Sequence, residues 1–186
     1  IKGNLLIEEL YARILPAPFL SLLIDDCIKT GKDYNNGGAR YNSSYIQGVG
    51  TGTLTDSLSA IKYHVFDQKK LSLSDLNQIL KGNYENQESL RQDLLVNTLR
   101  YGNDEDYADE IMQSVFNCYF EAVDGKPNYK GGHFRINMLP TTCHVYFGSV
   151  LLATADGRLA FTPVSEGISP VQGTDVNGPT AVIKSA

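Results

Sequence analysis

The sequence has no tryptophan, only three cysteines in 186 residues and no long apolar run. A membrane-spanning helix needs about 20 consecutive, mostly apolar residues. Because no such run occurs, we expect no membrane partner. The first residues, Ile1 to Asn4, also lack the basic, apolar and small-residue order of a secretory signal peptide.

The cysteines lie 91 and 25 residues apart, and no Cys-x-x-Cys pair occurs. Disulfide frameworks and structural zinc sites need closely spaced or paired cysteines. The sequence therefore predicts neither, and it favours a reducing cytoplasm. The three histidines are 69 and 11 residues apart, without the spacing of a metal site, so we expect no bound metal.

Basic residues are not in excess: the formal net charge is -5 and the pI is about 5.1. Phosphate backbones are bound by basic faces, so we expect no nucleic-acid partner. The hydrophobic share of 42% and the charged share of 20% are ordinary for one globular domain. The chain does not begin with Met and stops inside a predicted helix, so we expect a piece of a longer protein, truncated at both ends.

The hydrophobic periodicity predicts a chain of helices with two strands between them. We expect helices over residues 19–30, 54–65, 72–81, 87–99, 104–123 and 144–154, a last helix starting near Pro179, and strands over residues 39–47 and 132–138. For residues 144–154 a strand is the alternative to the favoured helix. The stretch from Val164 to Gly173 is expected to be extended. Strands separated by long helical inserts indicate an α/β architecture.

A glycine-rich loop, Gly48 to Thr53, lies between a predicted strand and a predicted helix. Such a loop can bind a phosphate or a dinucleotide at a helix N-terminus. This one lacks the Gly-Lys-Ser/Thr ending of a P-loop and departs from the G-x-G-x-x-G spacing at Thr53. A tight bend where two backbones approach closely is the favoured interpretation.

The cysteines are weak candidates for a nucleophile. Cys27 and Cys118 occupy packing positions of helices and are expected to be core thiols. Cys143, beside His144 at an apparent turn, has the most reactive local setting, yet a structural role is favoured. The irregular polar stretch from Glu166 to Asp175 is either a site-forming loop or a plain surface loop.

Two blocks of sequence resemble one known family. They are residues 23–28, 37–42 and 56–58 (Leu-Ile-Asp-Asp-Cys-Ile, Gly-Gly-Ala-Arg-Tyr-Asn and Asp-Ser-Leu), and residues 139–148, 155–158 and 168–170 with Gly173, Asp175, Gly178 and Pro179 (Leu-Pro-Thr-Thr-Cys-His-Val-Tyr-Phe-Gly, Ala-Asp-Gly-Arg and Ile-Ser-Pro). Together they look like the C-terminal part of the pyruvate formate-lyase domain of glycyl radical enzymes.

The resemblance implies a fragment, residues 1–186, of a ten-stranded α/β barrel with long helical inserts. In that family a cysteine thiyl radical and a glycyl radical meet on two loops inside the barrel, sheltered from water. It also implies that no cofactor is bound directly and that a separate radical S-adenosylmethionine activating enzyme installs the glycyl radical. The family is typically a homodimer.

The chain departs from the family pattern at both radical carriers. None of its cysteines lies in the family's Gly-Cys motif, and no Arg-Val-x-Gly-Tyr-like motif occurs. We therefore expect no catalytic residue in this chain, with the radical cysteine upstream of Ile1 and the radical glycine downstream of Ala186. The isolated piece is expected to be inactive.

Within the family, Val171-Gln172 resembles the glycerol and propane-1,2-diol dehydratases more than the hydroxyproline type. The resemblance implies elimination of water from a small diol-type substrate. It makes Ser169 a partner for a substrate hydroxyl, with Ile168 and Val171 on the apolar side. Alternatives are pyruvate formate-lyase itself, a choline- or hydroxyproline-type lyase, and an inactive structural fragment.

Overall fold

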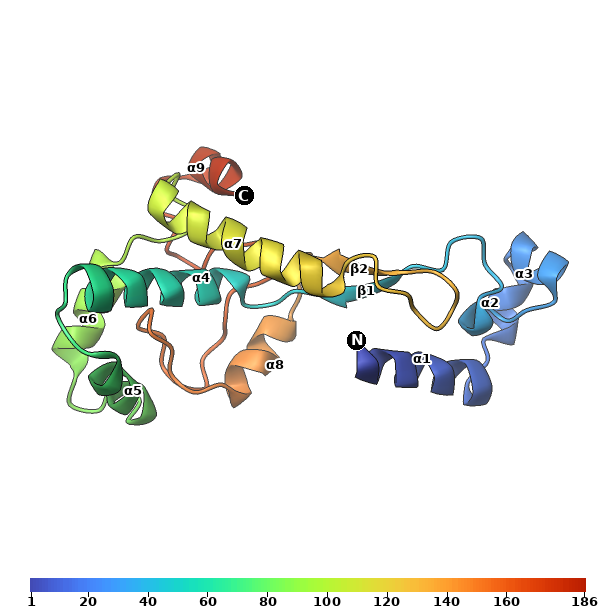
Figure 1. Ribbon diagram of the computed structural model, residues 1–186, viewed down its shortest axis with the longest axis horizontal. Coiled ribbons are helices and arrows are strands. Elements are labelled where there is room, and N and C mark those ends of the chain that lie inside the picture. The colour runs from blue at the N-terminus through green and yellow to red at the C-terminus, as the bar shows by residue number, and fades with distance from the viewer. The chain divides into compact units, whose positions relative to one another are not determined.

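The computed structural model describes all residues from 1 to 186, and helices are its main regular structure (Figure 1). The chain divides into two compact units, which we describe separately. The first comprises residues 1–46 and 119–137, and the second comprises residues 47–118 and 138–186. No helix combines the length and the apolar composition that crossing a bilayer requires.

Short helices make up the start of the first unit. They are α1 (Lys2–Ile14), α2 (Pro18–Leu22), α3 (Asp25–Thr30) and the single 3-10 turn η1 (Tyr34–Asn36). Proline at the first position starts α2, and Gly31, in the left-handed region with φ 64°, ends α3. The single helix expected over residues 19–30 is therefore two helices, because the backbone is extended at Ile24.

One carboxylate ties these short helices together. Asp33 accepts hydrogen bonds from the Ala17 amide (2.9 Å), the Ser21 hydroxyl (2.7 Å) and the Asn35 amide (2.8 Å). Side-chain bonds to nearby backbone compete with continued helix. They hold the chain in turns on both sides of α2 and α3.

The two strands, β1 (Ser44–Gln47) and β2 (Phe134–Asn137), pair in one two-stranded sheet. The strand expected over residues 39–47 forms only at its end, because the Asn42 amide donates to the Ala39 carbonyl at 2.9 Å and holds a local turn. The mixed α/β character is confirmed. A sheet of two strands does not close a barrel within this chain.

The second unit contains the remaining helices. They are α4 (Thr51–Ala60), the π-helix η2 (Ile61–Asp67), α5 (Leu73–Lys81), α6 (Glu88–Asn97), α7 (Asp106–Val123, of which the part after Cys118 belongs to the first unit), α8 (Cys143–Val150) and α9 (Pro179–Ser185). The start of α5 has a capping box, in which Ser72 and Asp75 bond each other's backbone amides. The helix expected over residues 144–154 ends at Val150, because Leu151 is extended.

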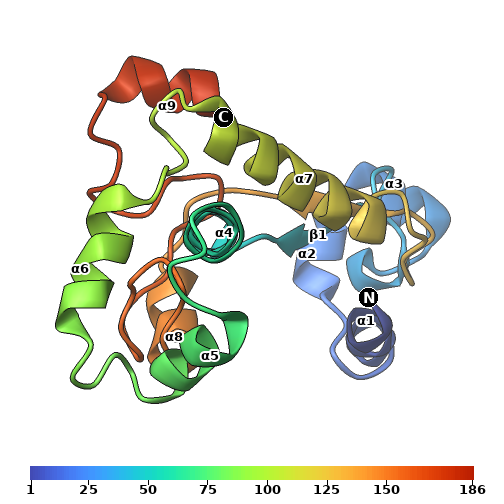
Figure 2. The same cartoon turned by 60° about the vertical axis from the view of Figure 1, so that its left-hand side comes forward.

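The second unit has two buried apolar clusters. The larger contains Ala60, Leu76, Tyr84, Leu94, Ala153 and Ala155; the smaller contains Tyr101, Ala108 and Met112. Helix α4 runs beside α7 (Figures 1 and 2), and the buried Thr55 hydroxyl donates to the Met112 sulfur at 3.5 Å. The extended segment after α8 packs against α4, where the Thr53 amide donates to the Ser165 hydroxyl at 2.9 Å.

Candidate functional site

The segment from Val164 to Asp175 has no regular structure and is held against the start of α4. The Gly50 amide donates to the Ser165 carbonyl (2.9 Å) and the Thr53 amide to the Ser165 hydroxyl (2.9 Å). The Ser165 amide in turn donates to the Thr53 hydroxyl at 2.8 Å. The first amides of a helix have no partner within the helix, and this segment supplies one.

The glycine loop acts as a close-approach bend. A Cβ atom on Gly52 would lie 2.7 Å from the Ser169 carbonyl oxygen and 3.0 Å from the Ser165 hydroxyl. Gly50 has φ 80°, in the left-handed region that favours glycine. Since the segment itself fills the space at the start of α4, the bend interpretation holds and the phosphate-loop alternative does not.

The three predicted site residues, Ile168, Ser169 and Val171, lie together in this segment and are all half-buried. The Ile168 amide donates to the Met138 carbonyl at 3.0 Å, and the Ile168 carbonyl accepts from the Tyr101 hydroxyl at 3.0 Å. The Ser169 hydroxyl makes no hydrogen bond within the chain. The backbone on both sides of it is held by the bonds of Ile168 and by the contact of Pro170 with Gly102.

Ile168 also lines a cavity of about 620 Å³ in the second unit. Helix α7 provides most of its wall, and the end of the chain provides the rest: Asp106, Asp109, Glu110, Met112, Gln113, Phe116, Asn117, Lys184, Ser185 and Ala186. One oxygen of Asp109 accepts from the Ser185 hydroxyl at 2.8 Å, and the other is buried without a donor. Burial raises the pKa of Asp109. Ser169 and Val171 do not line this cavity.

A buried ion pair lies next to Tyr101, whose hydroxyl bonds the segment. Arg100 Nη1 lies 3.0 Å from Asp56 Oδ2, and the Tyr101 amide donates to Asp56 Oδ1 at 3.0 Å. Arg100 Nη2 donates to the Asp156 carbonyl at 2.7 Å. Burial raises the pKa of Asp56 to about 7, although the Arg100 guanidinium opposes the rise. The sequence signalled Asp56 and Asp156 through the family blocks, but nothing local signalled Arg100.

A second network of buried polar groups holds the turn from Ala155 to Arg158. The Asp156 carboxylate accepts from the Thr154 hydroxyl (2.5 Å), and the Ser57 hydroxyl oxygen lies 3.3 Å from it. The Arg158 guanidinium donates to backbone carbonyls on both sides of it, including Thr162 at 2.7 Å. Buried polar groups paired in this way specify one backbone arrangement. This network fixes the turn between α8 and the candidate segment.

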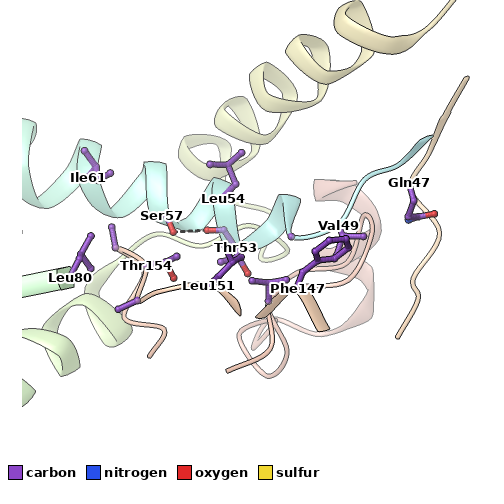
Figure 3. Close-up of a pocket in the computed structure, with 14 residues that line it drawn as sticks. Gln47, Val49, Thr53, Leu54, Ser57, Ile61, Leu80, Phe147, Leu151 and Thr154 are labelled. Atoms are coloured by element: carbon purple, nitrogen blue, oxygen red, sulfur yellow. Dashed lines mark hydrogen bonds between the residues drawn. The ribbon is translucent and has the colours of Figure 1, made fainter. Parts of the chain in front are cut away.

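An apolar pocket of about 510 Å³ lies beside this network (Figure 3). Leu80 and Ile61 lie at one end of it, and Phe147 and Val49 at the other. Within the pocket the Ser57 hydroxyl donates to the Thr53 carbonyl at 2.7 Å. The lining has no titratable side chain, so the pocket can contribute apolar contact but no acid–base chemistry.

The three cysteines differ in burial. Cys27 is buried, and burial, with Asp33 and Asp26 nearby, raises the pKa of its thiol. Cys143, the first residue of α8, is exposed. Cys118 is also exposed, so the expectation of a core thiol there was wrong: its face of α7 borders a surface pocket and not the core.

The side chains of His64 and His144 have structural partners. His64 is fully buried in η2, with Nε2 3.1 Å from the Thr98 hydroxyl. His144 Nδ1 lies 2.7 Å from the Thr141 carbonyl, and its Nε2 lies 3.7 Å from a Glu166 carboxylate oxygen. No group of three or more metal-ligating side chains comes together in the structure.

Comparison with known proteins gives consistent matches. A family model described as "Pyruvate formate lyase-like" matches residues 1–148. The chain is 56% identical over 185 residues to trans-4-hydroxy-L-proline dehydratase of Clostridioides difficile, which covers 100% of this chain and 23% of the relative.

The solved structures agree with the sequence matches. The crystal structure of the Clostridioides difficile hydroxyproline dehydratase with trans-4-hydroxy-L-proline bound matches with a TM-score of 0.93 over 99% of this chain and 23% of its own. The glycerol-bound B12-independent glycerol dehydratase of Clostridium butyricum matches at 40% identity and a TM-score of 0.88, over 96% of this chain and 23% of its own. The chain thus spans about a quarter of the length of these relatives.

Proposed function

The chain belongs to the pyruvate formate lyase-like family of glycyl radical enzymes, and we propose that it forms part of the wall of the substrate cavity in a radical dehydratase. The complete protein would remove water from a small hydroxylated substrate. The observation that carries this proposal is the 56% identity to a hydroxyproline dehydratase along the whole chain. We also propose that the chain forms part of a ten-stranded α/β barrel in the full-length protein.

The proposed chemistry begins with a cysteine thiyl radical outside this chain. The thiyl would abstract a hydrogen atom from a carbon of the substrate. The neighbouring carbon–oxygen bond would then break as the hydroxyl group takes up a proton, balanced by one lost from an O–H or N–H of the substrate, and leaves as water. The cysteine thiol would return its hydrogen atom to the product radical, which restores the thiyl. This chain would position the substrate and exclude solvent. The free Ser169 hydroxyl would hydrogen-bond a polar substrate group, with Ile168 and Val171 as apolar wall.

The proposed substrate class is a hydroxylated cyclic amino acid of the trans-4-hydroxyproline type. Identity to the hydroxyproline dehydratase (56%) exceeds identity to the glycerol dehydratase (40%). A small diol is the second candidate, and Val171-Gln172 favours it by its resemblance to the diol enzymes. The proposed partners are a radical S-adenosylmethionine activating enzyme and a second copy of the protein.

The test uses the full-length protein, activated without oxygen and supplied separately with trans-4-hydroxyproline, propane-1,2-diol and glycerol. We expect a dehydrated product from trans-4-hydroxyproline, identified by NMR. Turnover of a diol but not of trans-4-hydroxyproline would instead make a small diol the proposed substrate. Formation of an acyl-coenzyme A and formate from pyruvate, with no dehydration, would refute the dehydratase proposal.

A matched pair of variants would test the role of the wall. Ser169→Ala removes the free hydroxyl and should weaken use of the substrate by about 10-fold to 100-fold in kcat/KM, since one hydrogen bond to a bound ligand group is lost. Ser149→Ala, at an exposed serine whose hydroxyl bonds only the Tyr146 carbonyl, should leave kcat/KM unchanged. Equal effects of the two variants would argue against Ser169 as a ligand.

A further inference from the structure

Three consecutive residues before α7, Tyr101 to Asn103, each hold a different part of the candidate segment. The Tyr101 side chain is fully buried, and its hydroxyl donates to the Ile168 carbonyl at 3.0 Å. Gly102 lies against Pro170, where a Cβ atom would come within 2.3 Å of the proline Cγ. These contacts fix the segment on either side of Ser169.

Asn103 fixes the far end of the same segment. Its side-chain amide donates to the Thr174 carbonyl at 2.9 Å, and its Oδ1 accepts from the Asn177 amide at 3.2 Å. The Asn177 side chain returns a bond to the Asn103 carbonyl at 2.9 Å. The whole stretch from Ile168 to Asn177 is thus tied to one short piece of chain.

Residues 101–103 are themselves held by buried groups. Arg100, directly before them, pairs with Asp56 on α4 and donates to the Asp156 carbonyl. The Tyr101 amide adds a second bond to Asp56 at 3.0 Å. Because these groups are buried and paired, residues 101–103 can act as a rigid support, which we call the bracket.

We propose that the bracket, Tyr101 to Asn103, sets the position of the Ile168–Thr174 wall and thereby decides which hydroxylated substrate fits against Ser169. This inference rests on the proposed function, in which Ser169 faces the substrate. The bracket residues are positioning residues and do not touch the substrate. Gly102 is the specificity-determining position, because any side chain there collides with Pro170 and displaces the wall next to Ser169.

The decisive variant is Gly102→Ala in the activated full-length protein. We expect kcat/KM for trans-4-hydroxyproline to fall by about 100-fold, the order of loss that a misplacement of about 1 Å produces. The smaller glycerol should lose far less or gain, so the ratio between the two substrates shifts by about tenfold or more. The content of glycyl radical, measured by electron paramagnetic resonance, should not change.

Gly125→Ala is the matched control. Gly125 has a similar left-handed backbone (φ 72°, against 94° for Gly102), but nothing lies within 4 Å of a Cβ atom there. It therefore carries comparable backbone strain without the contact to Pro170. An unchanged substrate ratio in Gly102→Ala, or the same change in both variants, would overturn the bracket as a determinant of specificity.

A second measurement separates failure of the bracket from failure of the proposed function. In Asn103→Ala, hydrogen exchange of the peptide covering residues 168–177 should become about tenfold faster, while α5 stays protected. Asn103→Asp keeps the acceptor for the Asn177 amide and should restore part of the protection. If the wild type turns over none of the substrates, the proposed function fails; if exchange is unaltered in Asn103→Ala, the bracket fails.

Discussion

The pair formed by Asp56 and Arg100 is an ion pair with both members buried, and it offers a quantitative test. Asp56 is fully buried and Arg100 is 8% exposed, with 3.0 Å between the paired atoms. The variants are Asp56→Asn, Arg100→Met and the double variant. Removing one member leaves a buried charge without its partner, which costs about 3–5 kcal/mol.

The two single variants should not be equal. Asp56→Asn leaves the guanidinium charged, since arginine does not lose its proton. Because the pKa of Asp56 is raised to about 7, the neutral amide resembles the protonated carboxyl that the native site already holds near pH 7, so we expect a smaller loss of about 2 kcal/mol. Arg100→Met leaves a carboxyl whose pKa burial already raises, and this carboxyl can bind a proton, so we expect about 3 kcal/mol.

The double variant leaves no charge in the site. Its remaining cost is the loss of the arginine donors to the Asp156 and Leu94 carbonyls, about 1–3 kcal/mol per buried unpaired group. We therefore expect the double variant to be more stable than the sum of the single losses predicts. The coupling energy should be about 2–3 kcal/mol.

Urea unfolding followed by far-ultraviolet circular dichroism measures these differences. Arg13→Met is the control, because its pair with Glu9 is largely exposed and should contribute about 0.5 kcal/mol or less. Losses that add within about 0.5 kcal/mol would mean that the two buried residues do not interact energetically, contrary to this expectation.

Three further outcomes are expected. Ser72→Ala removes the capping box of α5 and should lower the unfolding free energy by about 1 kcal/mol in the same assay. A thiol reagent should modify the exposed Cys118 and Cys143 in the native chain and leave the buried Cys27 unmodified until urea is added; rapid loss of all three thiols would contradict the described burial. Because burial raises the folded-state pKa of Asp56 above its ordinary 3.8, to about 7, the folded state binds the extra proton between about pH 4 and 7. The contribution of this group to stability should fall as pH rises through that window and level off above it, and Asp56→Asn should remove that part of the slope.

Local patterns predicted several elements well. The Ser72-Leu-Ser-Asp75 start correctly marked α5, and the acidic first turn marked the long α7, which begins at Asp106. These elements depend on contacts within a few residues, which a sequence displays directly. The strand expected over residues 132–138 forms at 134–137, where its alternating pattern marked it although its partner, β1, lies far away in the sequence.

Elements that depend on distant contacts were predicted less well. The break at Ile24 accompanies bonds made by Asp33, which a helical pattern over residues 19–30 does not reveal. No helix was predicted over residues 2–14, where the structure has α1. Within this chain α1 buries none of its residues. Helix α8 was expected to continue to residue 154 but ends at Val150, because the backbone is extended at Leu151. The composition of residues 151–154 does not show this change.

The candidate site shows the same division. The polar, irregular composition of residues 166–175 marked the segment, and the family resemblance singled out Ser169 within it. The supports of the segment lie 65 or more residues earlier, at Tyr101 to Asn103 and in the buried pair of Asp56 with Arg100. No periodicity connects positions so far apart, so only the folded chain brings these groups together.

The most direct test of the account is whether water elimination depends on a protein radical. The full-length protein would be treated without oxygen with an activating enzyme, S-adenosylmethionine and a reductant, and the radical content would be measured by electron paramagnetic resonance beside the rate of trans-4-hydroxyproline dehydration. The account predicts a rate that rises in proportion to the radical content and is absent before activation. Dehydration at the same rate in protein that was never activated, or a full radical signal with no elimination from any hydroxylated substrate, would contradict it.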